Sequence, residues 1–111
     1  MFYYLCMDTF QALADPTRRD ILELLATSGQ LPASDIYNKF SVSHPAISQH
    51  LKVLRDNELV TVEKKAQQRM YQINPAKLLE IDEWLKKLAT QWEERFDRLD
   101  ALLEKMKKER R

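Results

Sequence analysis

Residues 31–71 carry the pattern that most restricts the possible folds of this chain. They run from a short amphipathic helix through a tight turn into a second helix, and then into two short strands joined by a basic tip. Within the second helix, Ile47, Leu51 and Leu54 recur at positions i, i+4 and i+7, so they must face a core. Ser43 precedes this helix as a cap, because its hydroxyl can accept from first-turn amides. Few folds other than a winged helix-turn-helix need this order, so we expect a mainly α fold with a small β-hairpin wing.

The outer face of the second helix is polar. Its side chains are short or form hydrogen bonds, as do groups that reach base edges in a major groove, and they belong to Ser43, His44, Pro45, Ser48, Gln49 and Lys52. The strands add groups suited to phosphates or a minor groove, namely Lys64, Lys65, Gln68 and Arg69. We expect these residues to bind double-stranded DNA. We call the winged helix-turn-helix the head of the chain. The alternative is that this head binds another protein, and a protein-binding head would more typically show an aromatic or aliphatic patch on this face.

Positive charge is concentrated on the same stretch, although the whole chain carries only +1. Residues 41–73 hold five basic and three acidic residues, whereas residues 1–40 hold three basic and five acidic ones. Residues 74–111 are nearly balanced, with ten basic and nine acidic residues. A phosphate-binding surface requires such an excess, but a small excess predicts modest non-specific affinity unless two heads act together.

Two start signals divide the rest of the chain. Asp15-Pro16 and Asn74-Pro75 each combine a helix cap with a proline at the first helical position. We expect helices over residues 8–14, 16–26, 32–39 and 44–57, strands over 59–64 and 69–73 with a tip at 66–68, and a last helix that starts at residue 75.

The last helix carries a heptad seam. Its apolar residues fall on alternating three- and four-residue steps, interrupted only at Arg95, and they are Leu78, Ile81, Leu85, Leu88, Trp92, Leu99, Leu102 and Met106. Some 34 residues at 1.5 Å each give a rod of roughly 50 Å, longer than a head of this size. We expect the seam to pair with a second copy of the chain. The alternative, in which Leu78 to Leu88 pack on the head, leaves the apolar face from Trp92 to Met106 unexplained.

Several other classes of protein are excluded. No apolar run approaches the roughly 18–20 residues of a membrane helix, and MFYYLC lacks the basic flank and cleavage site of a secretory signal. No phosphate loop, nucleophile elbow or oriented Cys/His pair predicts an enzyme. The single cysteine, Cys6, excludes an internal disulfide and fits a reducing, cytoplasmic compartment. We expect Cys6 to be a small apolar residue, and an intersubunit disulfide switch is the alternative.

Residues 9–73 resemble the ArsR/SmtB family of bacterial winged-helix repressors. The resemblance is carried by ALADPTRRDILELL (12–25), SVSHPAISQHLKVLRDNELV (41–60) and RMYQIN (69–74). It implies a homodimer formed by the first and last helices, an autorepressor that binds a palindromic operator, and release from DNA on an unknown signal. The chain then divides into a dimerisation segment (1–14), a DNA-binding domain (15–74) and a dimerisation helix (75–111). Two features differ from the family pattern: Ala66 stands where many relatives have glycine in the wing turn, and the last helix is longer than usual.

Metal sensing is not expected. Metal sensors of the family carry a cysteine pair in the helix before the DNA-reading helix, which here is the helix expected over residues 44–57. Others carry histidine and acidic ligands on the last helix. Here LPASDI contains no cysteine and the last helix contains no histidine. A Zn²⁺ or arsenic site needs three or four converging donors, and His44 and His50 are six residues apart, so they point in different directions. We therefore predict no metal site and no cofactor, and we expect His50 to be a packed, hydrogen-bonded residue.

Overall fold

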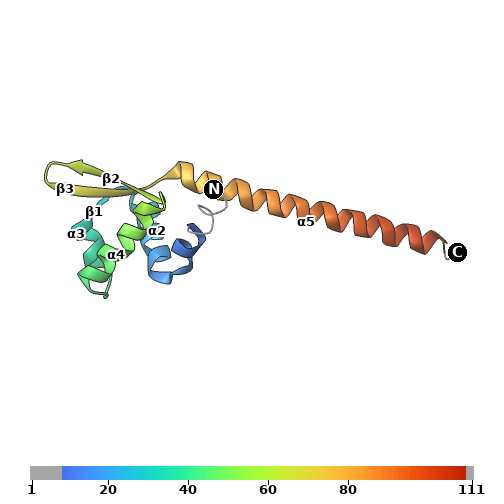
Figure 1. Ribbon diagram of the computed structural model, residues 1–111, viewed down its shortest axis with the longest axis horizontal. Coiled ribbons are helices and arrows are strands. Elements are labelled where there is room, and N and C mark those ends of the chain that lie inside the picture. Colours follow the sequence, from blue (N-terminus) through green and yellow to red (C-terminus); the bar gives the residue numbers. More distant parts are fainter. Residues whose placement is uncertain (1–8, 110–111) are drawn as a thin grey trace. The chain divides into compact units, whose positions relative to one another are not determined.

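The computed structural model describes residues 9–109, and the chain divides into two compact units, residues 1–77 and 78–111. Residues 9–14 are helical. The elements that follow are α2 (Pro16–Ser28), β1 (Leu31–Pro32), α3 (Ala33–Lys39), α4 (His44–Asp56), β2 (Val60–Lys65), β3 (Gln68–Ile73) and α5 (Pro75–Glu109) (Figure 1). The predicted mainly α fold with a β-hairpin wing and a long last helix is confirmed. The part of the predicted first helix at residue 8 lies outside the described residues.

The sheet has one strand more than the sequence predicts. Its three strands are antiparallel in the order β1-β3-β2, and β1 pairs Leu31 with Tyr71 and Pro32 with Met70. The prediction that a helix begins at residue 32 is therefore wrong by one residue. Pro32 is extended, with φ −70° and ψ 154°, and α3 begins at Ala33. Proline donates no backbone hydrogen bond, so it fits an edge strand, and two residues are too few to show an alternating pattern.

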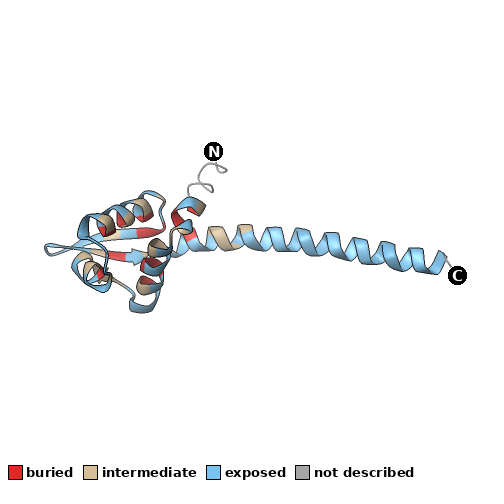
Figure 2. Cartoon of the chain, turned by 90° about the horizontal axis from the view of Figure 1, so that it is seen from below, coloured by how far each residue is buried: buried red, intermediate tan, exposed pale blue. Residues whose placement is uncertain are grey.

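The core of the first unit lies between its helices and the inner face of the sheet (Figure 2). It is formed by apolar side chains that are at most 9% exposed: Ala12, Ile21, Leu22, Leu25, Ile36, Ile47, Leu51, Leu54, Leu59, Val60 and Tyr71. The predicted inward stripe of α4 is thus confirmed, since its three members, Ile47, Leu51 and Leu54, are all buried. This stripe fixes which side of α4 is left facing solvent.

Two of the three predicted helix caps, Asp15 and Ser43, are confirmed by side-chain hydrogen bonds. At the third, α5 begins at Pro75 as predicted, but the side-chain amide of Asn74 donates to the carbonyl of Glu58 at 2.9 Å. The carboxylate of Asp15 accepts from the backbone N–H of Arg18 at 3.1 Å, and the hydroxyl of Ser43 accepts from that of Ala46 at 3.3 Å. The hydrogen bond from the Arg18 amide lowers the pKa of Asp15, because donation favours the carboxylate. A depressed folded-state pKa means that this cap stabilises the fold at neutral pH and is lost as the pH falls through that pKa.

Two arginines of α2 cap the C-terminal end of the first helix. The last four carbonyls of a helix have no partner within it. Arg18 donates to the carbonyls of residues 11–12, with Nε 2.7 Å from the oxygen of residue 12, and Arg19 donates to those of residues 13–14 at 2.9 and 3.0 Å. The PTRR segment therefore ends one helix while it begins the next.

The C-terminus of α4 closes with a Schellman motif that has an unusual residue at its key position. The N–H of Leu59 donates to the carbonyl of Leu54 at 2.9 Å, and the N–H of Glu58 donates to that of Arg55 at 3.0 Å. Glu58 has a φ of 60°, in the left-handed region where glycine is favoured. The motif turns the chain from α4 into the wing, so the fold retains it in spite of the strained residue.

Replacing Glu58 with glycine is expected to stabilise the protein. Relief of left-handed strain is worth about 1–2 kcal/mol, and the greater freedom of glycine in the unfolded chain removes about 0.5–1 kcal/mol of that gain. We expect a higher urea midpoint, equivalent to about 0.5–1 kcal/mol. The matched control is Asp56→Gly, which removes the same charge two residues earlier at a helical position and should destabilise. A lower midpoint for Glu58→Gly would contradict the strain argument.

Candidate nucleic-acid interface

The outer face of α4 is open to solvent. The predicted DNA-binding residues of this helix and its cap are all exposed, and they are Ser43, His44, Pro45, Ser48, Gln49 and Lys52. They gather on the side away from the buried stripe because α4 has only one apolar face. The structure thus brings these six residues to one surface, with hydroxyl, amide, imidazole and ammonium groups available for hydrogen bonds.

His44 at the start of α4 is held by the preceding helix. Its ring stacks on that of Tyr37 in α3, with centroids 4.8 Å apart and planes 16° from parallel. Stacking uses the faces of the imidazole and leaves the nitrogens at its edge for hydrogen bonds. Tyr37 therefore orients a residue of the predicted interface without itself being part of the sequence prediction.

The four predicted wing residues fall on two faces of the hairpin. Cross-strand partners share a face, so Lys64 and Arg69 lie on the same face as the buried Val60 and Tyr71, whereas Lys65 and its partner Gln68 lie on the other. The sequence treats Lys64 and Lys65 as one basic pair. The pleat of β2 separates them.

Lys65 is already engaged on its face. Its Nζ donates to Oε1 of Gln30 at 2.9 Å and lies 4.0 Å from Oε2 of Glu63. Gln30 in turn donates to Glu63 at 3.2 Å. Among residues 9–109, Lys64 and Arg69 have no comparable side-chain partner. Of the wing cations, these two are therefore the ones available to an outside anion.

The wing turn is tighter than predicted. Lys65 pairs with Gln68, so the tip consists of Ala66 and Gln67 alone, and Gln68 belongs to β3. Ala66 has a φ of 54°. A two-residue hairpin turn needs a left-handed residue there, which explains why glycine would suit this position.

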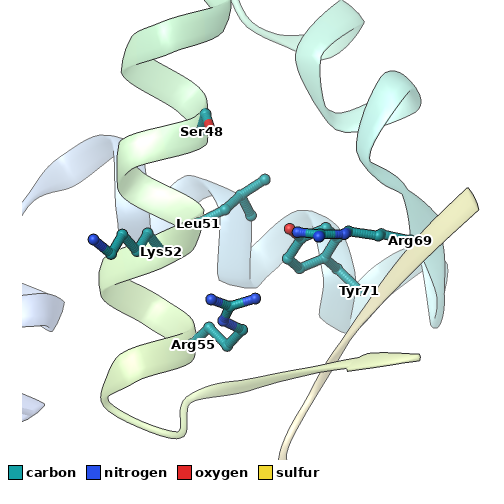
Figure 3. A pocket seen from close by; sticks show the side chains of 6 residues that line it. All are labelled: Ser48, Leu51, Lys52, Arg55, Arg69 and Tyr71. Atoms are coloured by element: carbon teal, nitrogen blue, oxygen red, sulfur yellow. The ribbon is translucent and has the colours of Figure 1, made fainter. Parts of the chain in front are cut away.

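An open hollow of about 180 Å³ separates α4 from β3 (Figure 3). The helix contributes Ser48, Leu51, Lys52 and Arg55, and the strand contributes Arg69 and Tyr71. Arg55 is exposed and was absent from the predicted set. Its signal was present in the sequence, because Ser48, Lys52 and Arg55 follow the i, i+4, i+7 spacing of a single helical stripe.

His50 has the structural role that was predicted for it. Its Nδ1 lies 3.2 Å from an Nη of Arg18, and arginine can only donate, so Nδ1 accepts. The same guanidinium donates to the end of the first helix. Arg18 therefore links that helix to α4.

The structure offers no cluster of metal donors within residues 9–109: no three His, Cys, Asp or Glu side chains come together. The predicted apolar residue Cys6 lies outside the described range. Over the same residues, no helix combines the length and the apolar character that crossing a membrane requires.

The predicted seam forms one stripe along α5. Seven of its eight members are between 37% and 61% exposed in the single chain, and Ile81 is half-buried. Phe96 and Leu103 widen the apolar face, and Trp92 packs edge to face with Phe96, with centroids 5.2 Å apart. A stripe of large apolar side chains this exposed on one helix marks an interaction surface.

Comparisons with known proteins agree with this architecture. A family model described as a helix-turn-helix domain matches residues 13–63. The transcriptional repressor SdpR of Bacillus subtilis is 38% identical over 78 residues, which cover 70% of this chain and 86% of that protein. The arsenical resistance operon repressor of Staphylococcus xylosus is 47% identical over 64 residues, 58% of this chain and 61% of that protein. A solved ArsR-like transcriptional regulator from Rhodococcus sp. RHA1 superposes with a TM-score of 0.82 at 28% identity, over 91% of this chain and 94% of that one.

A winged helix-turn-helix with an exposed second helix and a basic wing defines the class of DNA-binding transcriptional regulators. Within that class, the chain belongs to the ArsR family. The resemblance noted from the sequence is confirmed, and the alternative of a protein-binding head is not favoured.

Proposed function

We propose that this regulator is a homodimeric repressor that acts in the cytoplasm on a palindromic operator, including the one at its own promoter. Residues 15–74 of each copy bind one half-site, and residues 1–14 and 75–111 hold the two copies together. The observation that carries the proposal is the exposed polar face of α4, flanked by the free cations Lys64 and Arg69 of the wing. A two-fold protein that reads DNA with one such helix per copy fits a palindrome.

The two parts of the interface have different tasks in this proposal. Gln49 and Ser48 read base edges, with His44 and Pro45 beside them, because an amide can pair bidentately with adenine and proline can contact a thymine methyl. Lysine and arginine on the wing, together with Lys52, bind phosphates and set the register. Lys65 and Gln68 lie next to the tip of the wing, on the other face of the hairpin, and would contact DNA from there.

Base reading and phosphate binding can be separated by two substitutions. Gln49→Ala should cost about 1–3 kcal/mol on the operator and little on a random duplex. Lys64→Ala should weaken both complexes alike and lower the slope of log Kd against log salt by about one per head. Fluorescence anisotropy with the two duplexes measures both effects. Equal losses for Gln49→Ala on operator and random DNA would show that it does not read a base.

The homodimer part rests on the seam of α5. A heptad stripe that includes Leu88, Leu99 and Leu102 meets the requirement of a helix that packs against another helix. Two heads joined in this way also compensate for the small positive excess of each one, since affinities combine when both half-sites are engaged.

We further propose that the signal is not a metal ion. The described residues contain no group of three donors, and neither Cys6 nor the two histidines complete one in the sequence. Zn²⁺, Cd²⁺ or arsenite at low micromolar concentration should leave the operator Kd unchanged, and Cys6→Ser should still repress a reporter. A tenfold shift in Kd with any of them, about 1.4 kcal/mol, would overturn metal independence.

A further inference from the structure

We propose that the hollow between α4 and β3 seats one backbone phosphate of the bound duplex, and that Arg55 is a DNA-contacting residue there. Arg55 and Arg69 approach this space from two different elements, whereas Lys52 lines it with its stem and points its ammonium to the other side of α4 (Figure 3). The inference rests on the proposed DNA-binding function and adds to it a specific site and a residue outside the reading face.

Within residues 9–109, the cations of the hollow have no side-chain partner, whereas several other basic residues are engaged. Arg18 and Arg19 bind carbonyls, Lys65 binds Gln30, and Lys86 pairs with Asp82 at 2.8 Å. By contrast, the side chains that line the hollow make no hydrogen bond or ion pair within residues 9–109 through Lys52, Arg55 or Arg69.

No acidic residue lines the hollow either. The two guanidinium groups of Arg55 and Arg69 face one space without a counter-ion and repel one another, and a bound anion removes that repulsion. The site is therefore complementary to an anion and not to a cation or a neutral group.

Phosphate is the anion that these groups fit. Two guanidinium groups can each donate paired hydrogen bonds to phosphate oxygens. Leu51 and Tyr71 supply an apolar floor, since both are buried. A floor that excludes water strengthens the charged hydrogen bonds above it. A hollow of about 180 Å³ is several times the roughly 30 Å³ share of a water molecule, so it has room for a phosphate group.

The position along α4 indicates that the phosphate belongs to the DNA backbone. Gln49 and Arg55 are six residues apart in α4, which places them roughly 9 Å apart along its axis. When the N-terminal half of such a helix reads bases in the major groove, its later turns move toward the edge of the groove. The wing lies beside these later turns, so one sugar-phosphate strand would run between the two elements.

The first test uses the full chain and a duplex of arbitrary sequence, so it does not need the operator. Arg55→Gln and Arg69→Gln should each weaken binding about tenfold at low salt, as expected for a lost charge-assisted contact. The double variant should lose less than the product of the two, because both residues hold the same phosphate. Lys87→Gln on α5 removes one charge outside the predicted seam and should bind as the unchanged protein does. Melting curves verify that each variant is folded.

Arg55→Lys refines the test, because lysine keeps the charge but lacks the planar fork. It should bind more weakly than the unchanged protein and more tightly than Arg55→Gln. The inference is overturned if Arg55→Gln binds duplex as tightly as the unchanged protein, or if the Arg55 and Arg69 losses multiply. Failure of the unchanged protein to bind any duplex would instead overturn the proposed function.

A second test locates the phosphate. Single neutral methylphosphonates are placed along a duplex selected by the protein in vitro. At one linkage per half-site, the methylphosphonate should weaken binding of the unchanged protein but not of Arg55→Gln. The same methylphosphonate should still weaken binding of Gln49→Ala. If Arg55→Gln remains sensitive at every linkage, no phosphate sits on Arg55. If inorganic phosphate at matched ionic strength raises the melting temperature through Arg55 without DNA, the hollow is a small-anion site and the assignment to the backbone is overturned.

Discussion

Leu99→Asp combined with Leu102→Asp is expected to leave the protein monomeric and to weaken operator binding by a factor of about 100 or more. Both side chains are about half exposed in the single chain and lie in the distal part of the α5 seam. An interface between two copies would bury them, and burying two carboxylates per chain without a partner is strongly unfavourable. A monomer can occupy only one half-site, so the gain from binding two half-sites at once disappears.

Sedimentation velocity and anisotropy on the same samples measure both effects. Ala101→Asp is the control, because it places the same side chain between the two leucines but on the side of α5 away from the seam. It should stay dimeric and bind the operator normally. If the double aspartate variant sediments as a dimer, the distal seam is not the interface, and a monomer that keeps full operator affinity would separate dimerisation from DNA binding.

The elements that were predictable from the sequence are those with strong local signals. The stripe of Ile47, Leu51 and Leu54 fixed the inward face of α4, and Asp15 and Ser43 marked two helix starts to the residue. Each of these signals lies within one helical element and its cap, so no knowledge of the tertiary fold is needed to read it.

The features that escaped prediction depend on contacts between distant segments. The strand β1 exists only because Leu31 and Pro32 meet β3, some 40 residues later in the chain. The separation of Lys64 from Lys65 follows from the register of β2 on β3, which no local pattern specifies. Arg55 could have been found by extending the Ser48 and Lys52 stripe by one turn. The hollow that Arg55 lines could not, because it is completed by Arg69 from the wing.

The role of the PTRR segment also escaped prediction, because it depends on contacts outside the segment. The sequence identified Asp15-Pro16 as a helix start, and it gave no indication that the two following arginines turn back to the preceding helix. Arg18 also meets His50, which is 32 residues away. One guanidinium thus connects the end of the first helix, in the proposed dimerisation segment, with the helix proposed to read DNA.

Arg18→Met is therefore expected to cost about 2–4 kcal/mol of folding free energy. Methionine keeps much of the apolar stem but donates nothing, so the carbonyls of residues 11–12 and Nδ1 of His50 lose their donor together. Arg18→Lys should recover only part of the loss, because a single ammonium cannot span three acceptors in different directions.

The measurement is urea unfolding at one fixed chain concentration, since the stability of a dimer depends on concentration. Arg19→Met is the matched control. Its donors also cap the first helix, at 2.9 and 3.0 Å, but the bonds are exposed and none reaches α4, so the loss should be about 1 kcal/mol or less. Equal losses for the two variants would mean that the link to His50 adds nothing. A larger loss for Arg18→Met that His50→Ala reproduces in part would instead place the difference in the contact between the first helix and the reading helix.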